Sequence, residues 1–201
     1  MDKNIDYNIY ISGVGGQGII KTSVIIGEAA MREGLDVVMS EIHGMSQRGG
    51  SVSTELKIGN YKSSIVEQAK ADMILGFEPI EVLRGLEKSN KSTKIVFNDF
   101  PVIPSTLTQT GETYPDIEND IIANLKDNFD EVYPISATTL AKEAGSVLSL
   151  NMVLLGAAVA TEDFPLSRES VESAMKNNLA PKFHEMNLKA IELGYNAVKG
   201  L

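Results

Sequence analysis

The sequence predicts an α/β fold of the Rossmann-like type, with a mostly parallel sheet and helices on both faces. Short apolar segments typical of buried strands alternate with segments of helical period over residues 7–135. A turn containing four glycines joins the first strand to the first helix. Beyond residue 136 the pattern is helical to the end, which predicts a helical C-terminal third. No repeat or linker stands out, so we expect one domain over residues 1–201.

The chain opens with a β-α-β unit. We expect a strand over residues 7–12, a helix from residue 19 that ends at Glu33 and Gly34, and a second strand over residues 36–42. A unit this compact favours parallel strands joined by a right-handed crossover, and we take the two strands to be neighbours in the sheet.

An antiparallel hairpin is predicted next. Residues 52–58 alternate between apolar and polar side chains, the pattern of a strand with one face in solvent. Gly59 and Asn60 fall where a two-residue turn would sit, and residues 61–66 could form the returning strand. We therefore expect this hairpin to be inserted into the parallel sheet.

The α/β alternation then continues to the helical third. The predicted strands cover residues 72–77, 94–97 and 131–135, with helices from Pro79 and over residues 117–129. Four further helices are predicted over residues 137–144, 148–160, 168–179 and 181–199. The segment 148–160 is apolar nearly all round and should be buried, so Asn151 within it needs a partner, for which we expect a hydrogen bond from the helix to a loop.

Composition excludes several classes of function. The 27 acidic and 18 basic residues give a formal net charge of −9, the wrong sign for a general nucleic-acid binder. The chain has no cysteine, which removes thiolate nucleophiles, disulfides and the usual ligands of iron–sulfur clusters, and its two histidines are far apart. The start carries no signal pattern and the longest apolar run, residues 152–160, is too short to span a bilayer. We expect a cytoplasmic protein with no membrane partner.

The glycine turn is the first candidate site. It matches the G-x-G-x-x-G dinucleotide fingerprint between a strand and a helix, and Glu41 lies near the place of the acid that binds a ribose. Four interpretations stay open: a turn needed only for packing, a phosphate or acyl-carrier cofactor site, a nicotinamide or flavin site, and a partner surface. The residues of this candidate site are Gly13, Gly15, Gly16, Gln17 and Gly18.

The polar, glycine-rich loop over residues 43–50 is the second candidate. If the first two strands are neighbours and parallel, both loops leave the carboxyl edge of the sheet and should converge there. Arg48 would bring a permanent positive charge, and the amides of Gly49 and Gly50 would add donors for an anion. His43 is a candidate proton carrier. The structural alternatives are an ion pair between Arg48 and an acid such as Glu41, and a hydrogen bond from His43 to a backbone carbonyl.

Three motifs carry a family resemblance. They are Gly13-x-Gly-Gly-Gln-Gly18, Ser40-Glu-x-His-Gly-Met-Ser-Gln-Arg-Gly-Gly-Ser51 and Asn151-x-x-x-Leu-Gly156. With them the chain resembles the gamma subunit or domain of 2-oxoacid:ferredoxin oxidoreductases, and most of all the small beta subunit of indolepyruvate ferredoxin oxidoreductase. The whole chain would then be one pyruvate/ketoisovalerate oxidoreductase gamma-type domain.

The resemblance implies the oxidative decarboxylation of a 2-oxoacid to an acyl-coenzyme A in a complex with thiamine diphosphate, magnesium and 4Fe-4S clusters, with ferredoxin as electron acceptor. This chain has no cysteine and no Gly-Asp-Gly of the thiamine-diphosphate motif, so it resembles an accessory subunit that is inactive alone and whose larger partner holds those groups. A homodimer of the isolated chain also stays open. The alternative is a self-sufficient NAD(P)- or other nucleotide-binding protein.

The resemblance carries no metal ligand over to this chain, and the catalytic residue stays unknown, with His43 as the one candidate. The positions that it implies for cofactor binding are Gly13, Gly15, Gly16, Gln17, Gly18, Arg48, Gly49 and Gly50.

Overall fold

The computed structural model describes residues 5–43, 50–103 and 113–200. Its centre is a six-stranded sheet in the order β2-β3-β1-β4-β5-β6. The strands are β1 (Tyr7–Val14), β2 (Val37–His43), β3 (Ser51–Ile58), β4 (Met73–Gly76), β5 (Lys94–Asn98) and β6 (Val132–Ile135). β1, β4, β5 and β6 run parallel, which confirms the predicted mostly parallel sheet.

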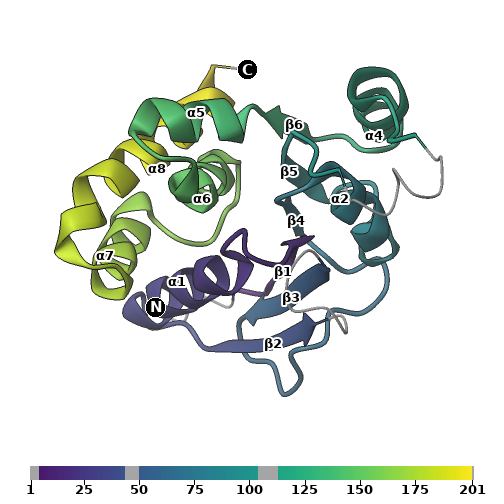
Figure 1. Cartoon of the computed structure of the whole chain (residues 1–201). Coiled ribbons are helices and arrows are strands. Elements are labelled where there is room, and N and C mark those ends of the chain that lie inside the picture. The colour runs from purple at the N-terminus through teal and green to yellow at the C-terminus, as the bar shows by residue number, and fades with distance from the viewer. Residues whose placement is uncertain (1–4, 44–49, 104–112, 201) are drawn as a thin grey trace.

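Helices cover both faces of the sheet (Figure 1). They are α1 (Ile19–Arg32), α2 (Pro79–Gly85), α4 (Ala123–Asn128), α5 (Ala137–Ala144), α6 (Leu150–Ala160), α7 (Arg168–Asn178) and α8 (His184–Lys199). Shorter helices are the 3₁₀ helices η1 (Leu86–Lys88), η3 (Val147–Ser149) and η4 (Pro181–Phe183) and the π-helix η2 (Ile117–Ile122). α1 and α5 to α8 share the larger core, while α2, η2 and α4 pack on the other face. Alternate strand residues serve the two cores: Leu75 points into the first and Ile74 into the second.

The neighbour of β1 differs from the prediction. β3 lies between β1 and β2 and is antiparallel to both, so β1 and β2 point the same way but are not adjacent. Hydrophobic period shows which faces of a strand are buried but not which strand pairs with it, and the short return from β2 brings β3 beside it. The antiparallel hairpin exists, but β2 and β3 form it.

The predicted returning strand over residues 61–66 was wrong. Gly59 has a φ of +130° and its N–H bonds to the carbonyl of Asp36, which ends β3 without a hairpin. Residues 61–71 then run irregularly across the outer face of β3, where Glu55 accepts a hydrogen bond from the N–H of Val66 and Lys57 donates to the carbonyl of Ile65.

The prediction that one face of β3 is exposed to solvent was wrong, because residues 61–71 cover that face. Glu55 is 2% and Lys57 3% exposed. Glu55 pairs with Lys88 at 3.1 Å and Lys57 with Glu67 at 3.0 Å, so these charges are paired beneath the covering segment instead of facing water. The alternation of polar and apolar residues correctly predicted which side chains of β3 share a face. It wrongly predicted that the polar face is exposed to solvent.

The helical third is built around α6, which is buried along almost its whole length, as predicted. α6 crosses α8 with glycine on each helix: a Cβ added to Gly194 would lie 1.8 Å from the carbonyl oxygen of Val153, and one added to Gly156 would lie 2.1 Å from that of Ile191. These backbones therefore touch without intervening side chains. Within the described residues, no helix has the length and apolar character needed to cross a membrane.

Candidate functional site

The glycine turn between β1 and α1 presents helix N–H groups to the carboxyl edge of the sheet. Gly18 caps α1 with a φ of 89° and has no side chain to bond the first turn. Gly16 has a φ of 103°, a left-handed conformation that side chains rarely adopt. The N-terminus of this 14-residue helix is thus free to attract an anion.

Two residues of the turn hold its shape. Gln17 Oε1 accepts a hydrogen bond from the N–H of Val14 at 2.7 Å, while Gln17 Nε2 donates to the carbonyl of Phe77 at 3.2 Å. A Cβ on Gly13 would lie 2.6 Å from Phe77 Cβ and 2.7 Å from Gln17 Oε1. Gly13 is therefore explained by packing against the end of β4, and Gln17 by closing the turn.

The two predicted loops meet where the structure describes them. The N–H of Gly15 donates to the carbonyl of Gly50 at 2.9 Å. They converge although β3 intervenes, because antiparallel pairing places Ser51 beside Val14. Arg48, Gly49 and the side chain of His43 lie outside the described residues, although the backbone of His43 ends β2.

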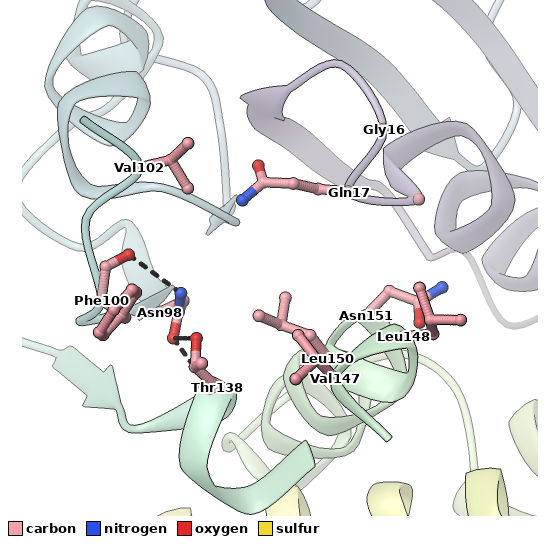
Figure 2. Close-up of a pocket in the computed structure, with 11 residues that line it drawn as sticks. Gly16, Gln17, Asn98, Phe100, Val102, Thr138, Val147, Leu148, Leu150 and Asn151 are labelled. Carbon is pink, nitrogen blue, oxygen red and sulfur yellow. Dashed lines mark hydrogen bonds between the residues drawn. The ribbon is translucent and has the colours of Figure 1, made fainter. Parts of the chain in front are cut away.

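A cleft of about 350 Å³ opens beside the glycine turn (Figure 2). One side is the turn itself, and the others come from the end of β5, the start of α5 and the start of α6. Its lining consists of Gly16, Gln17, Gly18, Asn98, Phe100, Val102, Thr138, Val147, Leu148, Leu150 and Asn151. It thus lies where open α/β sheets bind ligands, and its described walls are mainly apolar with a few amides and one hydroxyl.

A second cleft of about 360 Å³ adjoins the first and shares Gly18, Leu148 and Asn151 with it. It adds Lys21, an exposed cation in the first turn of α1. Since this cation stands at a helix N-terminus, negative charge is favoured on this side. Lys21 lies three residues beyond the glycine fingerprint and was missed from the sequence.

Asn151 stands between the two clefts and is only 8% exposed. Within the described part of the chain its side-chain amide makes no hydrogen bond, so the predicted helix-to-loop bond is not found there. A Cβ on Gly18 would lie 3.0 Å from Asn151 Nδ2, which places the amide against the glycine turn. The amide atoms are not among the buried unpaired side-chain atoms, so solvent or a ligand in either cleft can reach them and bond to them.

Asn98 fixes the wall opposite the turn and was missed from the sequence. It is 1% exposed; its Nδ2 donates to the carbonyl of Phe100 at 3.2 Å, and its Oδ1 accepts from the N–H of Thr138 at 3.2 Å (Figure 2). The available signal was an amide directly after the apolar strand that was predicted to end at residue 97. A polar residue buried at a strand end is commonly held by its hydrogen bonds.

Large apolar side chains stand exposed around the mouth of the cleft. Leu148 is 86%, Phe100 55% and Val147 47% exposed. Single exposed apolar residues are ordinary, but these three line one opening. The rim therefore has the character of a surface that another molecule covers.

The described lining favours binding over catalysis. Among the described residues of the first cleft none is titratable, and Lys21 alone is charged in the second. No group of three or more His, Cys, Asp or Glu that could hold a metal occurs in the described ranges. The site can bind, orient and exclude water, and it offers no described acid or base for a reaction.

Comparison with known proteins places these features in a family. A family model described as pyruvate ferredoxin/flavodoxin oxidoreductase matches residues 8–197. The chain is 48% identical over 193 residues to the indolepyruvate oxidoreductase subunit IorB of Methanothermobacter thermautotrophicus, covering 96% of this chain and 98% of that one. It is 40% identical to IorB of Archaeoglobus fulgidus, with 96% of each covered, and 25% identical to the 2-oxoglutarate synthase subunit KorC of Methanothermobacter marburgensis, with 92% and 93% covered.

Solved structures agree with the fold. The gamma subunit of keto/oxoacid ferredoxin oxidoreductase from Geobacter sulfurreducens superposes with a TM-score of 0.72 at 24% identity, covering 97% of this chain and 99% of that one. The 2-oxoglutarate:ferredoxin oxidoreductase from Magnetococcus marinus, solved with 2-oxoglutarate, coenzyme A and succinyl-CoA, gives 0.75 at 24% identity over 98% of this chain and 31% of that one. The family model and the two IorB relatives confirm the resemblance indicated by the three sequence motifs.

Proposed function

The chain belongs to the pyruvate ferredoxin/flavodoxin oxidoreductase family, and on that premise we propose that it is the small accessory subunit of an indolepyruvate:ferredoxin oxidoreductase. The observation that carries the proposal is the 48% identity to an IorB subunit over nearly the full length of both chains. In the proposed reaction the 2-oxoacid loses its carboxylate as carbon dioxide, the acyl group passes to the sulfur of coenzyme A, and the electrons pass to ferredoxin.

The chemistry of the described site supports an accessory role. The chain has no cysteine to ligate a cluster, and its first cleft presents no described titratable group. We therefore propose that a larger partner subunit holds thiamine diphosphate, magnesium and the 4Fe-4S clusters, which supply the carbon–carbon bond cleavage and the electron transfer when bound. The isolated chain should be catalytically inactive.

We propose that the paired clefts receive coenzyme A. The first turn of α1 and Lys21 suit a phosphate, and the apolar walls with the unpaired amide of Asn151 suit the slender, amide-bearing arm of that molecule. The main-chain amides of Gly16 and Gly18 would add donors at the turn. Arg48, Gly49 and Gly50 stay candidate positions on the second loop.

The exposed rim of Phe100, Val147 and Leu148 supports a partner surface. Because the relatives are named as subunits, we propose that the larger subunit covers this rim and closes the cleft. Burial of apolar side chains at such a contact would stabilise the complex and exclude water from the site.

A self-sufficient dinucleotide-binding protein is the alternative, and the sheet order disfavours it. The acid that binds a ribose normally ends the strand next to the glycine turn. Glu41 lies near the end of β2, which β3 separates from β1. Glu78, which follows the neighbouring β4, is buried and hydrogen-bonded to the backbone of α2. Neither carboxylate has the place that the fingerprint requires.

Purification of the untagged chain from its own cells tests the proposal. We expect it to copurify with a larger, cysteine-containing chain, iron and thiamine diphosphate, and the complex to reduce ferredoxin with indolepyruvate and coenzyme A. Calorimetry of the isolated chain should show no binding of NAD(H) or NADP(H). A colourless chain without such a partner, or dinucleotide binding, would contradict the proposal, and activity with another 2-oxoacid alone would correct the substrate.

A further inference from the structure

Glu78 is a buried carboxylate directly behind one wall of the cleft. It follows β4, is 2% exposed and accepts three hydrogen bonds. The donors are the N–H of Glu81 at 3.1 Å, the N–H of Val102 at 3.3 Å and the hydroxyl of Tyr114. One carboxylate therefore joins the start of α2 to two segments that follow β5.

All three of these donors are neutral, and the ion pairs found in the described structure do not include Glu78. Burial raises the pKa of the Tyr114 hydroxyl, and the hydrogen bond to Glu78 raises it further, so the phenol stays protonated and donates. A carboxylate can accept all of these bonds, whereas the NH₂ of a glutamine would face donor against donor at one of them. The position therefore favours an acid.

The bond to Val102 reaches the cleft directly, because Val102 lines it. Phe100, two residues before Val102, belongs to the same wall, and its carbonyl accepts a hydrogen bond from Asn98. The carbonyl of Phe77 accepts from both Gln17 Nε2 at 3.2 Å and Asn98 Nδ2 at 3.5 Å. The glycine turn and the opposite wall are thus both anchored to the end of β4.

We propose that Glu78 is a positioning residue, which sets the width of the cleft by holding the wall at Val102. It touches no ligand and acts through the backbone of that wall. The identity of the ligand, coenzyme A, rests on the proposed function, whereas the placement of the wall does not. A pre-ordered wall spares the ligand the entropic cost of ordering it on binding.

Glu78→Asp separates this role from that of capping α2. Aspartate keeps the charge and is a favoured N-cap residue. Its side chain is one methylene shorter, so it cannot cap α2 and also reach both Val102 and Tyr114. Tyr114→Phe removes a single donor from the carboxylate. Tyr133→Phe is the matched control, because the hydroxyl of Tyr133 also donates to a glutamate, Glu131, while Tyr133 lines neither cleft.

Two measurements test the proposal. In the isolated chain, amide hydrogen exchange at Val102 should be about tenfold faster in Glu78→Asp, the size expected for losing one or two hydrogen bonds. In the purified complex, KM for coenzyme A should rise by a similar factor while kcat and KM for the 2-oxoacid change less than about twofold. Tyr114→Phe should shift both readouts in the same direction by a smaller factor, and Tyr133→Phe should shift neither.

The proposal is overturned if Glu78→Asp folds and matches the wild type in both readouts, or if Tyr133→Phe raises KM equally. Should Glu78→Asp fail to fold, Tyr114→Phe decides by the same two criteria. A wild-type complex that does not use coenzyme A would refute the proposed function, and hydrogen exchange at Val102 would still decide whether Glu78 holds the wall.

Discussion

Replacing Gly13 by alanine tests whether the first glycine of the turn serves packing or ligand binding. Gly13 lies in β1 opposite Val52, and a Cβ there would meet Phe77 Cβ at 2.6 Å and Gln17 Oε1 at 2.7 Å. Ordinary contacts of this kind begin near 3.4 Å. Phe77 Cβ must therefore move by about 0.8 Å, and Gln17 must leave the bonds that close the turn.

The expected cost has two parts. Overpacking of this size costs about 1–3 kcal/mol. The two hydrogen bonds of Gln17 contribute about 1 kcal/mol each, although water replaces part of them when the side chain swings out. We expect the free energy of unfolding to fall by about 3 kcal/mol, which for a chain of this length lowers Tm by about 6–12 °C.

Urea denaturation of the purified chain measures this loss. The matched control is Gly27→Ala in α1, where the nearest atom to an added Cβ is Val37 Cγ1 at 3.9 Å. That variant should keep its stability or gain up to about 1 kcal/mol, because alanine is the better helix former. A packing role for Gly13 would be refuted if Gly13→Ala unfolded like the wild type yet lost coenzyme A-dependent activity in the complex, since Gly13 would then act through the ligand.

Three further predictions test other parts of the structure. Gly194→Ala places a Cβ 1.8 Å from a backbone carbonyl oxygen of α6, so urea denaturation should show a loss of about 3 kcal/mol or more, and wild-type stability would contradict the helix contact. Leu148 is 86% exposed, so Leu148→Asp should leave Tm unchanged but weaken assembly with the larger subunit at least about tenfold. The control Ile65→Asp, at a side chain 60% exposed, should change neither Tm nor assembly. Equal weakening of assembly by both variants would refute the rim as the interface. Burial raises the pKa of Glu28, but hydrogen bonds from Arg32 and from two asparagines of α7 outweigh it and leave the pKa below its ordinary 4.5. The ionised carboxylate therefore stabilises the fold above pH 4.5, and this stabilisation is lost as the pH falls through the lowered pKa. Glu28→Gln should therefore flatten the acid limb of Tm against pH, and an unchanged limb would contradict the assignment.

The spacing of apolar residues and the glycines at turns determined where most of the strands and helices lie. The buried strands near residues 7–14, 73–76 and 94–98, the glycine-capped start of α1 and the buried α6 all lie where the sequence predicts them. Each follows from local information, because period reports which faces meet the core and glycine permits a backbone that other residues avoid. The motifs that carried the family resemblance are likewise short stretches of sequence.

Only the tertiary structure decided which strands pair and which polar groups are buried. β3 separates β1 from β2, and the charges of Glu55 and Lys57 are paired beneath an irregular segment. Their partners lie at distant sequence positions, and no local pattern identifies them.

The candidate site divides in the same way. The sequence placed the glycine turn and predicted that the two loops converge, and the bond from Gly15 to Gly50 shows their ends together. It could not supply the opposite wall, because Asn98 and Glu78 act through hydrogen bonds to segments that only folding brings near. The turn is a local property of the chain, whereas the cleft beside it is a property of the fold.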